Sequence, residues 1–154
     1  MTKVIKIVET NRYQGGRRKE LNNIYFRSRW EANYARYLNF LNVKWQHEPK
    51  MFYFPRIRRG NVSYMPDFYL PDEDRWVEVK GYLDQPSRTK LKRFKKYYPE
   101  QFAKLTIVIR DPWAESKSAI EMMKFLEKLG IPTEAIEGYK EIEDKFGGLI
   151  AGWE

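Results

Sequence analysis

Two strand-like runs separated by an acidic turn constrain this chain more than any other part of it. The first run is Val62–Leu70, the second is Arg75–Lys80, and Pro71–Asp74 lies between them. Aromatic and β-branched residues occur in both runs, and a proline followed by three acidic residues is typical of a turn. The pattern predicts an antiparallel β-hairpin.

The register of this hairpin decides which side chains meet. If Asp72 and Glu73 are the two loop residues, Asp67 lies directly opposite Glu78. Opposed side chains on an antiparallel pair are about 4.5–5.5 Å apart at Cβ, so two carboxylates there repel each other unless a cation lies between them. Oxygen ligands of this kind suit Mg²⁺ or Mn²⁺.

Lys80 shares a strand face with Glu78, because alternate residues of a strand point to the same side. Beside a metal ion, its ammonium could stabilise negative charge on a phosphoryl group, or orient or deprotonate an attacking water. Two neighbouring carboxylates keep a lysine protonated, which favours the electrostatic and positioning role. The competing interpretation is an amphipathic hairpin whose charged residues line a solvated face.

Composition excludes several classes of site. The chain has 154 residues, no cysteine and one histidine, His47. Disulfides, thiolate zinc sites, cysteine nucleophiles and multi-histidine metal sites are therefore excluded, and we interpret His47 as structural. There is no signal-peptide pattern and no apolar run of about 20 residues, so we expect a soluble, cytoplasmic protein with no membrane partner. The length favours one domain over 1–154.

Positive charge is concentrated in the first two-thirds of the chain. The net charge is +10 over residues 1–60, +3 over 61–110 and −5 over 111–154. A basic region of this size favours a polyanionic partner such as DNA, although a solvated basic surface has the same composition.

Helical and strand-like patterns alternate along the chain. Lys3–Val8 alternates with a period of two, as in an edge strand, and residues 11–23 resemble a flexible basic arm. Periodicity and turn residues predict helices over 28–42, from 86 or 87 to 98, over 113–129 and over 139–146, and strands near Trp45, over 51–57 and over 105–109. This order predicts the α/β (α+β) class, with a mixed β-sheet flanked by helices.

Pro66-Asp67 followed by Glu78-Val79-Lys80 resembles the motif of the PD-(D/E)xK nuclease superfamily. The resemblance extends to an upstream helical glutamate, Glu31, and covers roughly residues 26–110. The arrangement is similar to that of small phage endonucleases of the endonuclease I, or resolvase, type, and a phage origin is one interpretation it allows. On this basis residues 1–25 are a basic arm with an edge strand, 26–110 a catalytic core and 111–154 an acidic helical segment.

The resemblance implies a restriction-endonuclease-like core and a set of roles. Asp67 and Glu78 would be metal ligands, joined by the backbone carbonyl of Val79 and, directly or through water, by Glu31. Lys80 would be the catalytic lysine, with Mg²⁺ as the cofactor and Mn²⁺ as its substitute. Glu31 has a second interpretation: Ser28 three residues before it forms a capping box, which requires no function.

Clusters of cations are the candidate DNA contacts. The helix after Gly81 carries six cations in nine residues, a hairpin turn near Arg58–Asn61 carries arginines, and so does the N-terminal arm. The candidate residues are Arg17, Arg18, Arg56, Arg58, Arg59, Arg88, Lys90, Lys92, Arg93, Lys95 and Lys96.

These observations predict a Mg²⁺-dependent DNA endonuclease. One alternative is a structure-specific resolvase of Holliday junctions or other branched DNA, and another is a non-catalytic DNA-binding subunit of a recombination or packaging complex. A single site cuts one strand, so a homodimer would explain double-strand cleavage and a monomer would explain nicking.

Overall fold

The chain divides into two compact units. The computed structural model describes residues 15–154. One unit comprises the residues up to Val43 together with Ile142–Glu154, and the other is Lys44–Glu141. The strand predicted over Lys3–Val8 and the start of the predicted basic arm lie outside the described residues. The expectation of one domain over 1–154 stays a prediction.

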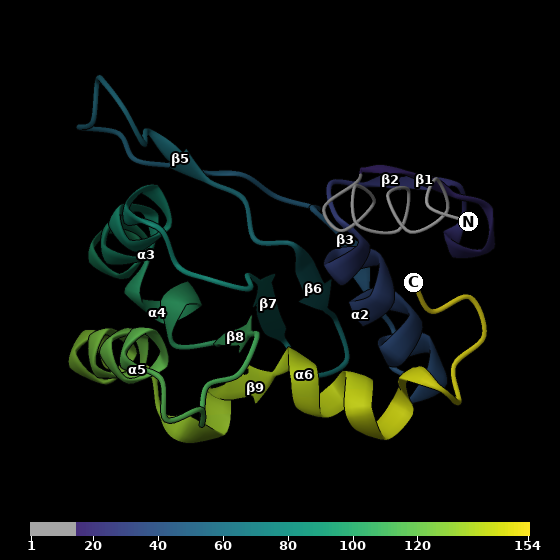
Figure 1. Ribbon diagram of the computed structural model, residues 1–154. Helices are drawn as coiled ribbons and strands as arrows, with labels where there is room; N and C mark the ends of the chain where they lie inside the picture. The colour runs from purple at the N-terminus through teal and green to yellow at the C-terminus, as the bar shows by residue number, and fades with distance from the viewer. Residues whose placement is uncertain (1–14) are drawn as a thin grey trace, which may run out of the picture. The chain divides into compact units, whose positions relative to one another are not determined.

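A five-stranded mixed sheet forms the frame of the second unit (Figure 1). Its strands lie in the order β3 (Gln46–His47), β6 (Phe68–Leu70), β7 (Arg75–Val79), β8 (Leu105–Ile109) and β9 (Ile136–Gly138). The β3–β6 and β6–β7 pairs are antiparallel, and the β7–β8 and β8–β9 pairs are parallel. The sequence did not predict β9, because three residues give no measurable periodicity. The mixed sheet with helices confirms the predicted α+β class.

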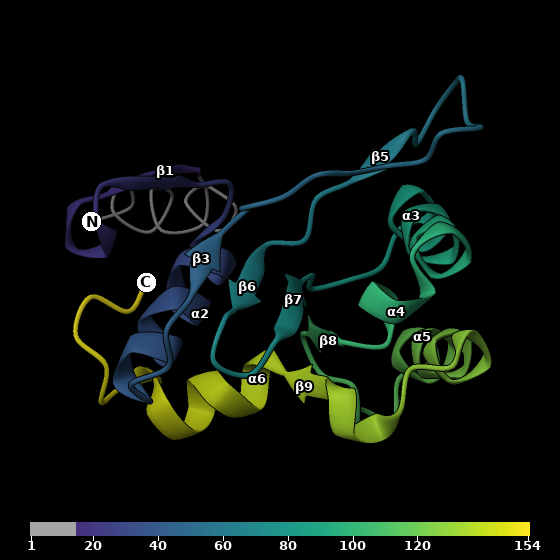
Figure 2. The same ribbon diagram turned by 180° about the vertical axis from the view of Figure 1, so that it is seen from behind.

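Three helices cover one face of this sheet (Figures 1 and 2). They are α3 (Gln85–Tyr97), α4 (Pro99–Phe102) and α5 (Lys117–Leu129). The core between them and the sheet includes Trp76, Leu91, Phe94, Leu105, Ile107, Ile109, Met122 and Leu126. Burying each of these side chains stabilises the fold by about 1.5–3 kcal/mol. All five residues of β8 are buried, which confirms the prediction of a central strand.

Local caps explain where the helices begin and end. Asp84 caps α3 by accepting the Ser87 N–H at 2.9 Å, and Ser116 caps α5 by accepting the Ala119 N–H at 3.2 Å. α5 therefore begins after Ser116, and the prediction that it begins at Trp113 is wrong. Pro99 was expected only to end a helix, but it also opens α4, where a missing N–H costs nothing.

A hairpin of β4 (Phe52–Tyr53) and β5 (Ser63–Tyr64) packs beside α3. The Phe52 ring lies 4.9 Å from the Phe94 ring and 5.2 Å from the Trp76 ring, measured between centroids. Beyond the paired residues, the connecting loop runs out past α3 in both views (Figures 1 and 2). This loop carries Arg56, Arg58 and Arg59, all of them exposed.

The first unit begins with a second hairpin. β1 (Gly16–Arg18) and β2 (Ile24–Phe26) pair antiparallel, and a 3₁₀ helix lies between them over Lys19–Leu21. From Gly16 onward the prediction of a flexible arm is therefore wrong. Asn22 and Asn23 have φ values of 58° and 56°. Asparagine tolerates this left-handed conformation, which allows the chain to turn back.

The α2 helix (Arg29–Phe40) and a C-terminal π-helical segment complete the first unit. α2 begins after Ser28 and confirms the helix predicted over 28–42. α6 (Tyr139–Ile142) continues into a π-helical segment over Glu143–Gly147, where a helix was predicted. The Phe146 ring lies 5.4 Å from the ring of Tyr37 on α2, which fixes this segment against that helix.

Arg36 anchors the C-terminal end of the chain to α2. Its side chain is 5% exposed and donates to Glu20, to Asn33 Oδ1 at 2.8 Å and to Glu154 Oε2 at 2.9 Å. Arg18 also donates to both carboxylate oxygens of Glu154. Removing the Arg36 side chain takes away its hydrogen bonds to three partners, each worth about 1 kcal/mol, so the loss is roughly 3 kcal/mol.

We therefore expect Arg36→Ala to lower the free energy of unfolding by about 3 kcal/mol, measured by denaturant unfolding at neutral pH. Lys19→Ala, at an exposed position of the same unit, serves as the control and should change it by less than about 0.5 kcal/mol. Equal stability of the two variants would show that the network contributes nothing.

Candidate active site

The β6–β7 hairpin has the register that the sequence predicted. Phe68 pairs with Val77, Tyr69 with Trp76 and Leu70 with Arg75. One step further along the same register, Asp67 lies opposite Glu78. The turn leaves four residues unpaired rather than two, but this change does not shift the pairing.

Contacts around Asp74 hold this turn in place. Asp74 has a φ of 50°, accepts the Tyr69 hydroxyl at 2.6 Å and pairs with the Lys104 ammonium at 2.6 Å. A one-residue slip of the hairpin would break both contacts and would move Asp67 to the other face. The turn therefore stabilises the register that brings the two carboxylates together.

Asp67 is held from two sides. Its Oδ2 accepts the Val79 N–H at 2.7 Å, and its backbone carbonyl accepts the Glu48 N–H at 2.9 Å. Its side chain is buried, with 7% of the residue exposed. The Asp67 carboxylate therefore sits at the point where β6 separates from β7, with β3 on its other side.

Glu78 is held by a buried tyrosine. The hydroxyl of Tyr64, a residue that is 4% exposed, donates to Glu78 Oε2 at 2.9 Å. Burial raises the pKa of the Tyr64 hydroxyl well above its usual 10.0, and the charges of Glu78 and Asp67 raise it further. The hydrogen bond to Tyr64 therefore ties the Glu78 carboxylate to the β4–β5 hairpin.

Lys80 follows directly after β7. Its backbone N–H donates to the Val108 carbonyl at 2.7 Å, which ties it to the parallel neighbour β8. Alternation along the strand puts its side chain on the Glu78 side. Hydrogen bonds from Ser87 lower the pKa of Asp84, and the positive charges of Lys80 and Lys90 lower it further. Asp84 is the residue that caps α3, so this helix begins shortly after Lys80 in the chain.

The Val79 carbonyl points toward the carboxylates rather than toward β8. Backbone groups of consecutive strand residues point to opposite sides, and the N–H of Lys80 points to β8. The N–H of Val79 points to Asp67, so its carbonyl faces the same side. This orientation is consistent with the ligand role that the motif implies for Val79.

Glu31 belongs to the first unit. Its backbone N–H donates to Ser28 Oγ at 3.3 Å, and the same hydroxyl is 3.3 Å from Glu31 Oε1. Ser28 therefore caps α2, as the capping interpretation predicted. That Glu31 also joins Asp67 and Glu78 stays a prediction.

The site offers ligands of one chemical kind. Two carboxylates and a backbone carbonyl are hard oxygen donors, which fit Mg²⁺ or Mn²⁺ and do not favour a soft metal. The carboxylates are opposed on neighbouring strands and partly buried, so their mutual repulsion is only weakly screened. A divalent cation would relieve that repulsion.

The structure gives several of the candidate DNA-binding cations partners within the protein. Arg88 forms a bidentate ion pair with Glu121. Arg93 donates to the Asn61 carbonyl at 2.7 Å, and Lys95 donates to the Leu129 carbonyl. Lys92 and Lys96 are exposed and Lys90 is half-buried. Direct DNA contact is therefore easier to envisage for Lys92 and Lys96 than for Arg88.

The two N-terminal arginines also differ. The side chain of Arg18 is 10% exposed and bound to Glu154, so it has a structural role in the first unit. Arg17 is exposed and donates to the Asn23 carbonyl at 2.9 Å. For both, contact with DNA stays a prediction.

Two residues near the carboxylates were not recognised in the sequence, Tyr64 and Glu48. Tyr64 lies three residues before Asp67, but only the fold of the β4–β5 hairpin reveals that its hydroxyl reaches Glu78. Glu48 follows the two-residue strand β3 and is hydrogen-bonded to Asp67 through its backbone. Long-range pairing of this kind leaves no local pattern.

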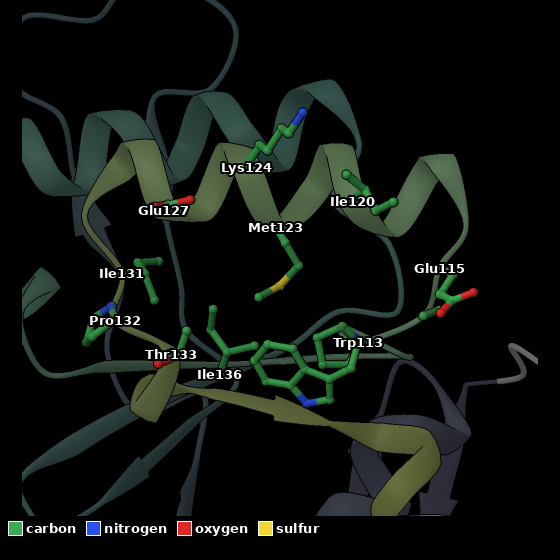
Figure 3. A pocket seen from close by; sticks show the side chains of 12 residues that line it. Trp113, Glu115, Ile120, Met123, Lys124, Glu127, Ile131, Pro132, Thr133 and Ile136 are labelled. Atoms are coloured by element: carbon green, nitrogen blue, oxygen red, sulfur yellow. The ribbon is translucent and has the colours of Figure 1, made fainter.

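A separate apolar hollow of about 630 Å³ lies between α5 and the segments before and after it (Figure 3). Trp113, Met123 and Ile136 point into it, and Glu115, Lys124 and Glu127 are its charged lining residues. An apolar lining with more acids than cations does not suit a phosphate backbone. We therefore do not assign this hollow to nucleic acid.

Comparisons with protein-family models, with curated proteins and with solved structures gave no match. In the described part of the chain, the helices are too short or too polar to cross a bilayer.

Proposed function

We propose that this protein is a Mg²⁺-dependent endonuclease that hydrolyses DNA phosphodiester bonds. The observation that carries the proposal is the β6–β7 register, which opposes Asp67 and Glu78 and leaves Lys80 at the end of the same strand. The order of α2, the β6–β7 hairpin, α3 and β8 is consistent with the restriction-endonuclease-like core that the motif implies. An amphipathic hairpin without a function would explain one acid beside one lysine on a solvated face. It would not explain two acids that oppose each other and are partly buried.

Asp67, Glu78 and the Val79 carbonyl would hold the cation. When bound, it would act as a Lewis acid on a phosphoryl oxygen and lower the pKa of a bound water. The protein residues supply fixed geometry: Asp67 is held by the Val79 N–H, and Glu78 by the Tyr64 hydroxyl. According to the motif, Glu31 would be a third acidic residue that contacts the cation, directly or through water.

Lys80 would stabilise the negative charge that develops on the phosphoryl group. A water attacks phosphorus, the bond to the 3′ oxygen breaks, and the water's proton is released as the 3′ oxygen takes one up. The products are a 5′-phosphate and a 3′-hydroxyl. We assign Lys80 charge stabilisation and positioning, because an ammonium beside the cleaved phosphate can stabilise the negative charge of the transition state.

The charge distribution supports DNA as the substrate. The loop between β4 and β5, which carries Arg56, Arg58 and Arg59, belongs to the unit that contains the carboxylates, and so do the exposed lysines of α3. Cations that neutralise phosphates release counterions, so each such contact makes binding more dependent on salt. The acidic C-terminal third of the chain is less suited to this contact.

Replacing both Lys92 and Lys96 with alanine tests this interface. We expect the slope of log affinity against log salt concentration to become shallower by up to about 1.8, which corresponds to two phosphate contacts. Fluorescence anisotropy with a labelled duplex measures the slope. The paired control is Lys124→Ala with Lys128→Ala, two exposed lysines on α5 that should leave it unchanged. If only the control pair altered the slope, DNA would bind on the α5 side.

A cleavage assay tests the proposed activity directly. The protein is incubated with supercoiled plasmid, linear duplex and a four-way junction, each with Mg²⁺ and with chelator. Cleavage that requires Mg²⁺ supports the proposal, and a strong preference for the junction would identify a resolvase. Nicked and linear plasmid products distinguish one-strand from two-strand cutting. Binding without cleavage of all three substrates would favour a non-catalytic DNA-binding subunit.

A further inference from the structure

Tyr64 has a hydrogen bond that packing alone does not require. Its ring contributes to the core, with its centroid 4.9 Å from that of Phe94, a contact that phenylalanine would make equally well. Its hydroxyl instead reaches Glu78 Oε2 at 2.9 Å from a position that is 4% exposed. Bringing a hydroxyl into such a position costs free energy unless it is hydrogen-bonded, and here its partner is a carboxylate of the candidate site.

We infer that Tyr64 is a positioning residue that orients the Glu78 carboxylate for metal binding. The inference rests on the proposed function, since it concerns the same site. A carboxylate attached through two methylene groups has rotational freedom, and a hydrogen bond to one oxygen fixes the direction of the other. Residues that support metal ligands in this way typically change metal affinity or activity by 10–100-fold when they are removed.

Tyr64 is itself held firmly. It ends β5, pairs with Phe52 of β4 and packs against α3 through Phe94. The β4–β5 hairpin and α3 therefore set the place of the hydroxyl, and the hydroxyl sets the place of the carboxylate. A tyrosine on a mobile loop could not hold the Glu78 carboxylate in one orientation.

The test is the affinity of the whole chain for Mn²⁺, measured by isothermal titration calorimetry without DNA. We expect Tyr64→Phe to weaken Mn²⁺ binding by about 10–100-fold, while thermal unfolding remains cooperative. Tyr53→Phe is the matched control: it removes a hydroxyl from the same β4–β5 hairpin, at a position that is 61% exposed. It should bind Mn²⁺ as the unmodified protein does.

A double-mutant cycle separates positioning from general destabilisation. If Tyr64 acts through Glu78, Tyr64→Phe should have no further effect on Mn²⁺ affinity once Glu78→Gln is present. The inference would be overturned if Tyr64→Phe weakened Mn²⁺ binding by the same factor in the unmodified protein and in Glu78→Gln. It would also be overturned if Tyr64→Phe alone left Mn²⁺ affinity unchanged. In both cases the proposed function would stand if the unmodified protein binds Mn²⁺. Failure of the unmodified protein to bind Mn²⁺ would overturn the proposed function and the inference together.

Discussion

Asp67→Asn is expected to abolish Mg²⁺-dependent cleavage of plasmid DNA, with a loss of roughly 10³-fold or more in rate. The change removes one negative charge from the metal site but keeps the size of the side chain. Loss of a metal ion's contribution to the transition state costs several kcal/mol, and each 1.36 kcal/mol is tenfold in rate. The amide oxygen can still accept the Val79 N–H, so the fold should be retained.

The control for this variant is Asp72→Asn. Asp72 lies in the exposed turn of the same hairpin, and the substitution makes the same change in charge. It should cleave at close to the original rate. Binding of the duplex by Asp67→Asn should persist, because DNA contact is assigned to the cations of the hairpin loop and α3. Full activity of Asp67→Asn would remove this residue from the metal site.

Lys80→Met is expected to lower the rate of cleavage by about 10²–10⁴-fold, measured under single-turnover conditions with saturating Mg²⁺. Methionine retains much of the length of lysine but carries no charge. Because Lys80 is not assigned as a metal ligand, Mn²⁺ affinity should change little. Lys124→Met is the matched control, since Lys124 is an exposed lysine on α5 that is assigned neither to the candidate site nor to DNA binding.

Lys80→Arg distinguishes the two roles open to this residue. Arginine keeps the positive charge but does not lose its proton in proteins, so it cannot act as a base. Partial activity of Lys80→Arg would support charge stabilisation, and activity as low as that of Lys80→Met would favour proton abstraction. A rate for Lys80→Met equal to that of Lys124→Met would exclude Lys80 from the reaction.

The central hairpin could be predicted because its determinants are local. The acidic turn, the alternation on either side of it and the opposed acids all lie within about 20 residues of sequence. The structure has the same register for Phe68 with Val77 and for Tyr69 with Trp76. The buried strand Leu105–Ile109 was equally clear, because a nearly continuous apolar run is typical of a central parallel strand.

Other parts of the fold depend on contacts that no local pattern shows. β9 forms because Ile136–Gly138 lies beside β8, and the β1–β2 hairpin depends on two asparagines with positive φ. Tyr64 is recognisable as part of the site only when the β4–β5 hairpin lies against α3.

The cations of α3 show that a count of charges in the sequence does not reveal which of them are free to bind a ligand. The sequence gives six cations in nine residues, which favours a DNA-binding surface. It does not show that Glu121 on α5 would pair with Arg88, or that the Leu129 carbonyl would accept from Lys95. Side-chain partners from distant segments therefore decide which charges remain for a ligand.

Anomalous diffraction from crystals soaked in manganese tests the central claim most directly. We predict one strong manganese peak bonded to oxygens of both Asp67 and Glu78, which is lost in crystals of Asp67→Asn. A map without density at this pair, or one in which the two carboxylates turn away from each other around an ion bound elsewhere, would contradict the assignment.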